Sequence, residues 1–270
     1  MADRGADVHR AAVLGSPIAH SLSPALHRAA YAGLALPWTY EAIEVDEAGL
    51  PAFLTGLDGT WAGLSLTMPL KEAVIPLLSE VDEEARALRA VNTVLPGADG
   101  WRGTNTDVYG IVEALLTAGL AGQPNTATVL GAGATARSAV AALVRLGVGD
   151  VIICARRQDA AQEVAALASS FGIVASTRDL GPELSVLATD IVISTLPGDA
   201  GAPWALLAPD ARGALLDASY HPWPTPLAQA WGSPVVASGR DMLLWQAVEQ
   251  VRLMTGLEPP AELMSAALPA

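Results

Sequence analysis

The chain has 270 residues, of which 51% are apolar, so it can form one large domain or two of ordinary size. Acidic residues outnumber basic ones by 28 to 15, and the formal net charge of −13 argues against nucleic acid or an anionic membrane as a partner. The single cysteine, Cys154, cannot form an internal disulfide, and the segment 1–10 lacks the apolar core of a secretory signal. We therefore predict a cytoplasmic protein with a disordered N-terminal tail and no membrane-spanning segment.

Short apolar runs alternate with helical patterns through the first hundred residues. We predict strands at 11–15, 38–45 and 62–67, and helices at 24–34, near 47–57 and from Pro69. Ser23 and Pro24 are predicted as the N-cap and the first-turn residue of a helix. Runs at 90–96 and 100–105, separated by the turn sequence GADG, predict a hairpin. The alternation predicts an open, largely parallel sheet.

A second alternating series follows residue 107. Its predicted strands are ATVLGAG, DVIICA, DIVISTLP, GALLDAS and PVVAS, with helices to about 146 and across 158–170. A long amphipathic helix is predicted over 239–257, and a shorter one from Pro259. The chain is thus predicted to be an α/β protein with two open-sheet domains, one at 1–107 completed by helices in 241–270, and the other at 108–240.

The sequence VLGAGATA at 129–136 matches the pattern G-x-G-x-x-[G/A] through Gly131, Gly133 and Ala136. In a dinucleotide-binding unit the first glycine makes the turn, the second lets the pyrophosphate approach the backbone, and the small third residue packs helix on strand. The alternative is a tight turn without a ligand. The position between a predicted strand and a predicted helix favours a Rossmann-type dinucleotide-binding domain.

The end of the next strand indicates which dinucleotide is bound. NAD-binding units carry an acidic residue about 20 positions after the glycines, where it binds the ribose 2′-hydroxyl. Here the strand end contains no acidic residue and reads Ala155, Arg156 and Arg157. The guanidinium groups of the two arginines can bind the 2′-phosphate of NADP. A solvated strand end is the alternative, and the position relative to the glycines favours NADP.

Polar clusters follow the predicted strands of the first domain: SLS at 21–23, T-x-P-x-K at 67–71, VNT at 91–93 and NTD at 105–107. Each has a local explanation as a helix cap, a turn or a leftover surface lysine. However, Lys71 is the only lysine of the chain, and lysine, unlike arginine, can release its proton. Pro69 puts it in the first turn of a helix, where the partial positive charge disfavours its ammonium form.

These blocks occur in the same order in a known family. GSPIAHSLSP, SLTMPLK, AVNT, GTNTD, GAGATAR and GRDMLLWQA resemble the shikimate dehydrogenases, which reduce 3-dehydroshikimate to shikimate with NADPH, and the resemblance runs from about residue 11 to 268. It implies an oxidoreductase of chorismate and aromatic amino acid biosynthesis that binds a small anionic substrate and acts as a monomer or homodimer. Lys71 would carry the catalytic proton, with Asp107 as its partner, and domain 1–107 would be the substrate-binding domain.

The remaining site residues also follow from the resemblance. Those expected to bind substrate are Ser21, Ser23, Thr67, Asn92, Tyr220 and Gln246. Those expected to bind NADP are Gly131, Ala132, Gly133, Ala134, Thr135, Ala155, Arg156, Arg157, Ala218 and Gly239. No metal is expected, because the four histidines show no ligand spacing.

The chain also departs from the family pattern. Ser65 stands where many members have asparagine, Ala155, Arg157 and Ala160 replace polar or basic residues around the cofactor arginine, and Arg240-Asp241 replaces a Leu-Gly pair. One alternative is a quinate or quinate/shikimate dehydrogenase that uses NAD, although Ser23 favours shikimate, since quinate-preferring relatives tend to carry threonine there. Another is a non-catalytic ligand sensor on the same fold, against which Lys71 and Asp107 argue.

Overall fold

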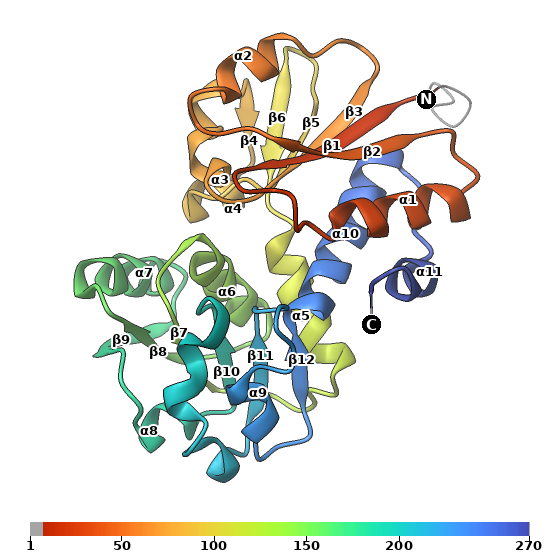
Figure 1. Cartoon of the computed structure of the whole chain (residues 1–270). Coiled ribbons are helices and arrows are strands. Elements are labelled where there is room, and N and C mark those ends of the chain that lie inside the picture. The colour runs from red at the N-terminus through yellow and green to blue at the C-terminus, as the bar shows by residue number, and fades with distance from the viewer. Residues whose placement is uncertain (1–7, 270) are drawn as a thin grey trace. The chain divides into compact units, whose positions relative to one another are not determined.

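The computed structural model describes residues 8–269, and the chain divides into two compact units (Figure 1). The first unit comprises residues 1–106 and 244–270, and the second comprises residues 107–243. The N-terminal tail predicted from the sequence falls largely on residues 1–7, which lie outside the described residues. Among the described helices, none is both long and apolar enough to cross a membrane.

The first unit is built on a six-stranded sheet in the order β2-β1-β3-β5-β6-β4. Its strands are β1 (Arg10–Gly15), β2 (Thr39–Glu44), β3 (Trp61–Leu66), β4 (Glu80–Val81), β5 (Thr93–Pro96) and β6 (Trp101–Thr104). Strand β1 pairs in parallel with β2 and β3, whereas β5 is antiparallel to both β3 and β6. The hairpin predicted around GADG is therefore present as β5 and β6.

Helices cover both faces of this sheet. They are α1 (Ser23–Gly33), α2 (Leu50–Thr55), α3 (Leu70–Ala73), α4 (Glu83–Leu88), α10 (Gly239–Thr255) and α11 (Ala261–Ala266). Because side chains alternate along a strand, Leu64 and Leu66 of β3 pack with α2, α3 and α4. Gly63 and Ser65 face the other way, toward Met254 and Gln250 of α10. A methyl group on Gly63 would lie 2.9 Å from Met254, so glycine lets this helix approach the sheet.

The second unit contains a parallel sheet in the order β12-β11-β10-β7-β8-β9. Its strands are β7 (Thr126–Leu130), β8 (Asp150–Ala155), β9 (Val174–Asp179), β10 (Ile191–Ser194), β11 (Ala214–Asp217) and β12 (Val236–Ser238). Its helices are α5 (Asp107–Thr117), α6 (Ala134–Arg145), α7 (Gln158–Ser170), α8 (Leu184–Leu187) and α9 (Pro226–Ala230), and α10 begins here. This strand order is that of a doubly wound dinucleotide-binding fold, with its topological switch point between β7 and β10.

The cores of this unit lie on the two faces of its sheet. One apolar cluster joins Leu130, Val192 and Leu215 of the strands to α8, α9 and the tryptophans Trp204 and Trp231. Helices α5, α6 and α7 lie on the opposite face (Figure 1). Cys154 is fully buried in β8, as predicted.

The start of α1 differs from the prediction, because Ser23 is not its N-cap. Leu22 occupies that position with helical dihedrals, φ −88° and ψ −8°, and it makes no side-chain cap. The Ser23 backbone N–H instead donates to the Ser21 hydroxyl oxygen, over 3.3 Å. Since the chain is already helical at Leu22, the hydroxyl that meets this amide comes from two residues earlier.

Candidate active site

Two polar segments of the first unit meet at the carboxyl ends of β1 and β3. The Thr67 N–H donates to the Leu14 carbonyl over 2.9 Å, and the Ser16 N–H donates to the Met68 carbonyl over 3.2 Å. These bonds place the segment that leads to Ser21 and Ser23 beside T-x-P-x-K. Open α/β sheets build their sites at this edge.

The lysine segment is also tied to the asparagine segment by backbone hydrogen bonds. The Val91 N–H donates to the Lys71 carbonyl, and the Leu66 N–H donates to the Asn92 carbonyl, each over 2.8 Å. The main chains of Thr67, Lys71 and Asn92 are therefore fixed relative to one another. The sequence suggested that these residues share a site, but only the pairing of the strands brings them together.

Lys71 is the second residue of α3, as the prediction of a first-turn position requires. However, α3 contains only four residues, and Pro69 is its N-cap rather than a residue within it. A helix macrodipole sums over aligned peptide units, and a single turn contains few of them. The prediction therefore lacks the extended run of aligned peptide units on which it depended.

Asn92 lies at the centre of a buried set of polar side chains, and its own exposure is 1%. Its Oδ1 accepts a hydrogen bond from the Thr106 N–H over 2.8 Å, and its Nδ2 lies 3.4 Å from Oε1 of Gln246. The structure thus brings together two of the residues expected to bind substrate. Thr106 is the middle residue of the NTD cluster at 105–107, and the sequence provided no reason to assign it a role of its own.

The serine pair is supported by a buried histidine. Ring atom Nδ1 of His27 lies 3.0 Å from the Ser23 carbonyl, one helical turn earlier, so this nitrogen carries the hydrogen. The ring stacks on Tyr40 with 3.9 Å between centroids. Burial lowers the pKa of His27 to about 4, against which the Ser23 hydrogen bond acts only in part. His27 is therefore neutral at physiological pH and acts as packing behind Ser23.

In the second unit, Gly131 forms the turn between β7 and the helix α6. Its φ is +113°, a region that favours glycine, and its N–H donates to the Cys154 carbonyl of β8 over 2.8 Å. An added Cβ would lie 2.2 Å from Oγ1 of Thr195, which directly follows β10. The glycine loop therefore sits at the switch point between β7 and β10. Thr195 was missed in the sequence, although its place after the strand IVIS was a signal.

A cavity of about 510 Å³ lies beside this loop. Its lining includes several residues predicted to bind the cofactor, namely Gly131, Ala132, Gly133, Ala155, Arg156 and Arg157. Arg156 and Arg157 are exposed at the end of β8, and the Gln158 side chain ties this strand end to β9 by donating to the carbonyls of Ala155 and Arg178. Ala160, one of the departures from the family pattern, also lines the cavity and leaves room near the arginines.

Ala218 and Gly239, both expected to bind NADP, are in contact. A Cβ on Gly239 would lie 2.2 Å from the Ala218 carbonyl oxygen, so only glycine permits this approach. The next residue pair in the chain, Arg240-Asp241, departed from the family pattern. Asp241 accepts hydrogen bonds from the N–H and the hydroxyl of Ser238, and Ser238 Oγ accepts from the Asp241 N–H. This reciprocal arrangement is a capping box that stabilises the start of α10.

Tyr220 and Asp107 also belong to the second unit. Tyr220 is half-buried in the loop after β11, and Asp107 is the first residue of α5, with an exposure of 4%. The loop of Tyr220 is held by Asp217, which accepts hydrogen bonds from the Thr225 hydroxyl over 2.6 Å and from the Ser219 N–H over 3.2 Å. Burial raises the pKa of Asp217. Asp217 was not singled out in the sequence.

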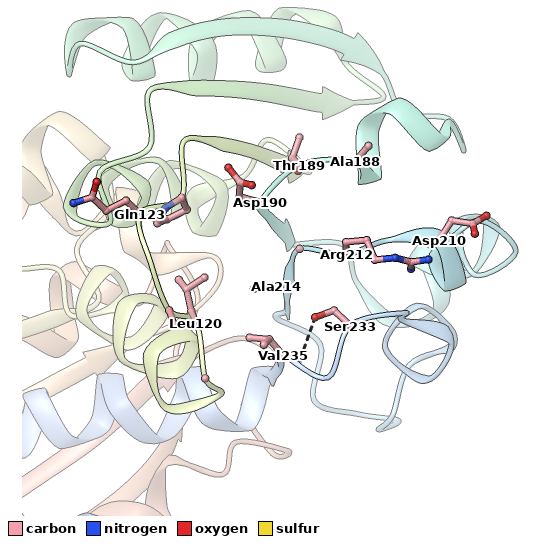
Figure 2. Close-up of a pocket in the computed structure, with 14 residues that line it drawn as sticks. Leu120, Gln123, Ala188, Thr189, Asp190, Asp210, Arg212, Ala214, Ser233 and Val235 are labelled. Atoms are coloured by element: carbon pink, nitrogen blue, oxygen red, sulfur yellow. Dashed lines mark hydrogen bonds between the residues drawn. The ribbon is translucent and has the colours of Figure 1, made fainter.

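A second cavity of this unit, about 620 Å³, contains none of the predicted site residues (Figure 2). It lies around the amino ends of β10 and β11. Its carboxylate Asp190 accepts hydrogen bonds from the N–H groups of Thr126 and Asn125 and from the Thr126 hydroxyl, which lower its pKa. Asp190 thus links the start of β7 to the start of β10 by hydrogen bonds.

Open α/β sheets bind ligands at their carboxyl edge. The smaller cavity, beside the glycine loop, is therefore the candidate cofactor site.

Comparisons with known proteins bear on the family of the chain. Family models match at residues 13–94, as the shikimate dehydrogenase substrate binding domain, and at residues 239–268, as the shikimate 5′-dehydrogenase C-terminal domain. Shikimate dehydrogenase (NADP(+)) of Thermus thermophilus is 38% identical over 252 residues, which cover 93% of this chain and 94% of that protein. The chain belongs to the shikimate dehydrogenase family.

Solved structures of the family share the fold. The crystal structure of Mycobacterium tuberculosis shikimate dehydrogenase is 41% identical with a TM-score of 0.89, covering 96% of this chain and 98% of that one. The Thermus thermophilus shikimate 5-dehydrogenase in complex with NADP(H) and shikimate is 36% identical with a TM-score of 0.83, at 96% and 98% coverage. The chain also matches the pentafunctional AROM polypeptide of Yarrowia lipolytica at 33% identity, over 93% of this chain but only 17% of that polypeptide. The predicted family and the predicted α/β fold with two open sheets are confirmed.

Proposed function

We propose that the chain catalyses the reversible reduction of 3-dehydroshikimate to shikimate with NADPH, with Lys71 as proton donor and acceptor and Asp107 as its partner. Its family supports a role in shikimate biosynthesis. The observation that carries the proposal is the joining of T-x-P-x-K to V-N-T at the carboxyl edge of the first sheet, by hydrogen bonds from Leu66 to Asn92 and from Val91 to Lys71. This edge collects hydroxyl, amide and ammonium groups, which suit a polyhydroxylated carboxylate.

The second unit has the features that NADP requires. Gly133 offers open space where a side chain would stand, since no atom lies within 4 Å of an added Cβ, and α6 begins at the next residue. A pyrophosphate can therefore approach the backbone amides at the start of this 12-residue helix. Arg156 and Arg157 would hold the 2′-phosphate. The prediction that the family cofactor is NADP is confirmed by relatives named for it and by a solved relative that contains it.

When bound, NADPH supplies the hydride that reduces the substrate carbonyl carbon. The carbonyl oxygen then needs a proton, which Lys71 Nζ donates, and the neutral amine regains a proton from solvent. In the oxidation direction, Lys71 takes the hydroxyl proton. Asp107, the proposed partner of Lys71, orients the amine. Ser21, Ser23 and Tyr220 bind the carboxylate of the substrate, while Thr67, Asn92 and Gln246 bind the carboxylate or the ring hydroxyls.

Initial rates test this function directly. We expect the highest kcat/KM with shikimate and NADP, and lower values when quinate replaces shikimate or NAD replaces NADP. A higher kcat/KM with quinate and NAD would instead support the quinate dehydrogenase alternative. Binding of shikimate without turnover by any cofactor would support the ligand sensor.

The variant Lys71→Arg tests the proton transfer. Arginine keeps the positive charge, but with a pKa above about 12 it cannot act as a base at neutral pH. Loss of general acid-base catalysis lowers turnover by about 10²–10⁴-fold, so kcat should fall within this range. Shikimate binding should persist in Lys71→Ala, as measured by calorimetry. A Lys71→Arg enzyme within about threefold of the parent turnover would refute the role of Lys71, because the lower end of that range is about a hundredfold.

A further inference from the structure

Gln250 of α10 is a buried residue that the proposed reaction does not use. Its exposure is 1%, and it lies one turn after Gln246 on the same helix. Its amide Nε2 donates to the Asn92 carbonyl over 3.1 Å and to the Thr93 hydroxyl over 2.9 Å. Its Oε1 accepts a hydrogen bond from the Ser65 hydroxyl over 2.8 Å. All the groups that contact it belong to the first unit.

The direction of each hydrogen bond in this network follows from two backbone groups. The Asn92 carbonyl can only accept, so the atom of Gln250 that faces it must be the nitrogen, and the atom that faces Ser65 must be the oxygen. The Ser65 hydroxyl therefore donates to Gln250 and accepts from the Tyr40 hydroxyl, 2.6 Å away. At the other end, the Thr106 N–H can only donate, so the Asn92 atom facing it is Oδ1.

Thr93 joins the two ends. Its hydroxyl accepts from Gln250 Nε2, so its own hydrogen is free to donate to Asn92 Oδ1, which lies 2.8 Å away. Asn92 Oδ1 thus receives hydrogen bonds from both Thr93 and the Thr106 backbone. These two donors occupy the carbonyl side of the Asn92 amide, so its NH₂ group faces the Thr106 hydroxyl oxygen at 3.0 Å and Oε1 of Gln246 at 3.4 Å.

We infer that Gln250 is a positioning residue, which acts through Thr93 to fix the Asn92 amide in the orientation that turns its NH₂ group toward Gln246, a second residue expected to bind substrate. Ser65 and Tyr40 hold Gln250 in turn, and the Tyr40 ring is fixed by its stacking on His27. The serine that departs from the family pattern is therefore the residue that fixes the Gln250 amide oxygen. This inference rests on the proposed function, because it assumes that Asn92 contacts the substrate.

The variants Gln250→Leu and Thr93→Val test the inference in the full chain. Gln250→Leu removes all three hydrogen bonds, and Thr93→Val removes only the hydroxyl that contacts Asn92 while keeping the size of the side chain. We expect each to raise the KM for shikimate about three- to tenfold, the factor that corresponds to one weakened hydrogen bond. The KM for NADP and kcat should stay within about twofold of the parent, because Asn92 serves neither the cofactor nor the proton transfer. Should Gln250→Leu fail to fold, Thr93→Val supplies the same comparison.

A double-mutant cycle separates positioning from a general structural effect. In an Asn92→Ala background, Gln250→Leu and Thr93→Val should no longer raise the KM for shikimate, because a residue that acts through Asn92 has nothing left to position. Met254→Ala is the matched control, since Met254 is equally buried one turn later on α10 and contacts Tyr31 rather than the network. It should lower the melting temperature and leave the KM for shikimate unchanged.

Three outcomes would overturn the inference. If Gln250→Leu raised the KM for shikimate by the same factor in the Asn92→Ala background as in the parent, Gln250 would not act through Asn92. An equal rise in Met254→Ala would show that the effect is loss of stability. An unchanged KM in Asn92→Ala alone would remove Asn92 from the substrate site, which is a failure of the residue assignment, whereas a parent chain that does not turn over shikimate would be a failure of the proposed function itself.

Discussion

The turn at Gly131 gives the sharpest prediction for the cofactor-binding unit. In Gly131→Ala, the new methyl group would lie 2.2 Å from Thr195 Oγ1, and the residue would have to keep a φ of +113°. Thr195 cannot move without cost, because its hydroxyl donates to the Leu130 carbonyl over 2.9 Å. Backbone strain at such a φ costs about 1–3 kcal/mol, and a broken hydrogen bond costs about 0.5–1.5 kcal/mol. We therefore expect the free energy of unfolding to fall by about 2–4 kcal/mol.

The assay is urea unfolding followed by circular dichroism, with Gly133→Ala as the matched control. At Gly133 the φ is an ordinary −93°, and no atom lies within 4 Å of the added Cβ, so stability should change by less than about 0.5 kcal/mol while NADP affinity falls. In the double variant Gly131→Ala with Thr195→Ala, removal of the hydroxyl should restore part of the lost stability. A Gly131→Ala protein as stable as Gly133→Ala would refute the reasoning.

The remaining predictions concern single side chains. Because burial lowers the pKa of His27 to about 4, below its ordinary 6.5, the folded state resists protonation, and the stability present above pH 6.5 is lost as the pH falls toward 4. This loss amounts to about 2 kcal/mol at pH 5. The variant His27→Phe retains a ring against Tyr40, so its free energy of unfolding should change less than that of the parent between pH 7.5 and 5. If the free energies of unfolding of the variant and the parent fell equally over this range, the assignment would be contradicted. Arg156→Ala should raise the KM for NADP roughly ten- to a hundredfold and leave the KM for NAD nearly unchanged. An equal rise in the KM for both cofactors would show that Arg156 has a structural role instead. Ser21→Ala should raise the KM for shikimate about tenfold and lower stability by about 0.5–1 kcal/mol, because Ser21 accepts the Ser23 N–H, and an unchanged KM would remove Ser21 from the carboxylate site.

The alternation of apolar runs predicted most of the fold, and its failures have a common cause. Strand β4 has only two residues, Glu80 and Val81, and β9 reads VASTRD with an exposed or half-buried side chain at every position. Neither segment carries a periodic apolar signal, so both depend on their partners, β6 and β8, to become strands. The hairpin of β5 and β6 was predictable because its turn residues act locally.

The candidate site shows a similar limit. Candidates such as Lys71 and Arg156 could be picked out because their type and position indicate chemistry. Residues that orient others could not, since Ser65 and Gln250 are 185 positions apart and are joined only because β3 and α10 pack together. The predicted N-cap of α1 was wrong for a local reason. The dihedrals of Leu22 determine that the Ser21 hydroxyl accepts the hydrogen bond from the Ser23 N–H.

The way Lys71 is anchored determines how its arginine variant can be interpreted. Its carbonyl accepts the Val91 N–H, while the Leu66 N–H donates to the Asn92 carbonyl, and both bonds are made by main-chain atoms that any residue other than proline supplies. Arginine also has a helix propensity close to that of lysine. We therefore expect Lys71→Arg to keep the free energy of unfolding within about 1 kcal/mol of the parent in urea unfolding. A large loss of turnover in such a protein would reflect the chemistry of the side chain rather than a displaced segment. A Lys71→Arg protein that unfolds at clearly lower urea would show that the lysine side chain also holds the segment in place, and its turnover would then no longer isolate proton transfer.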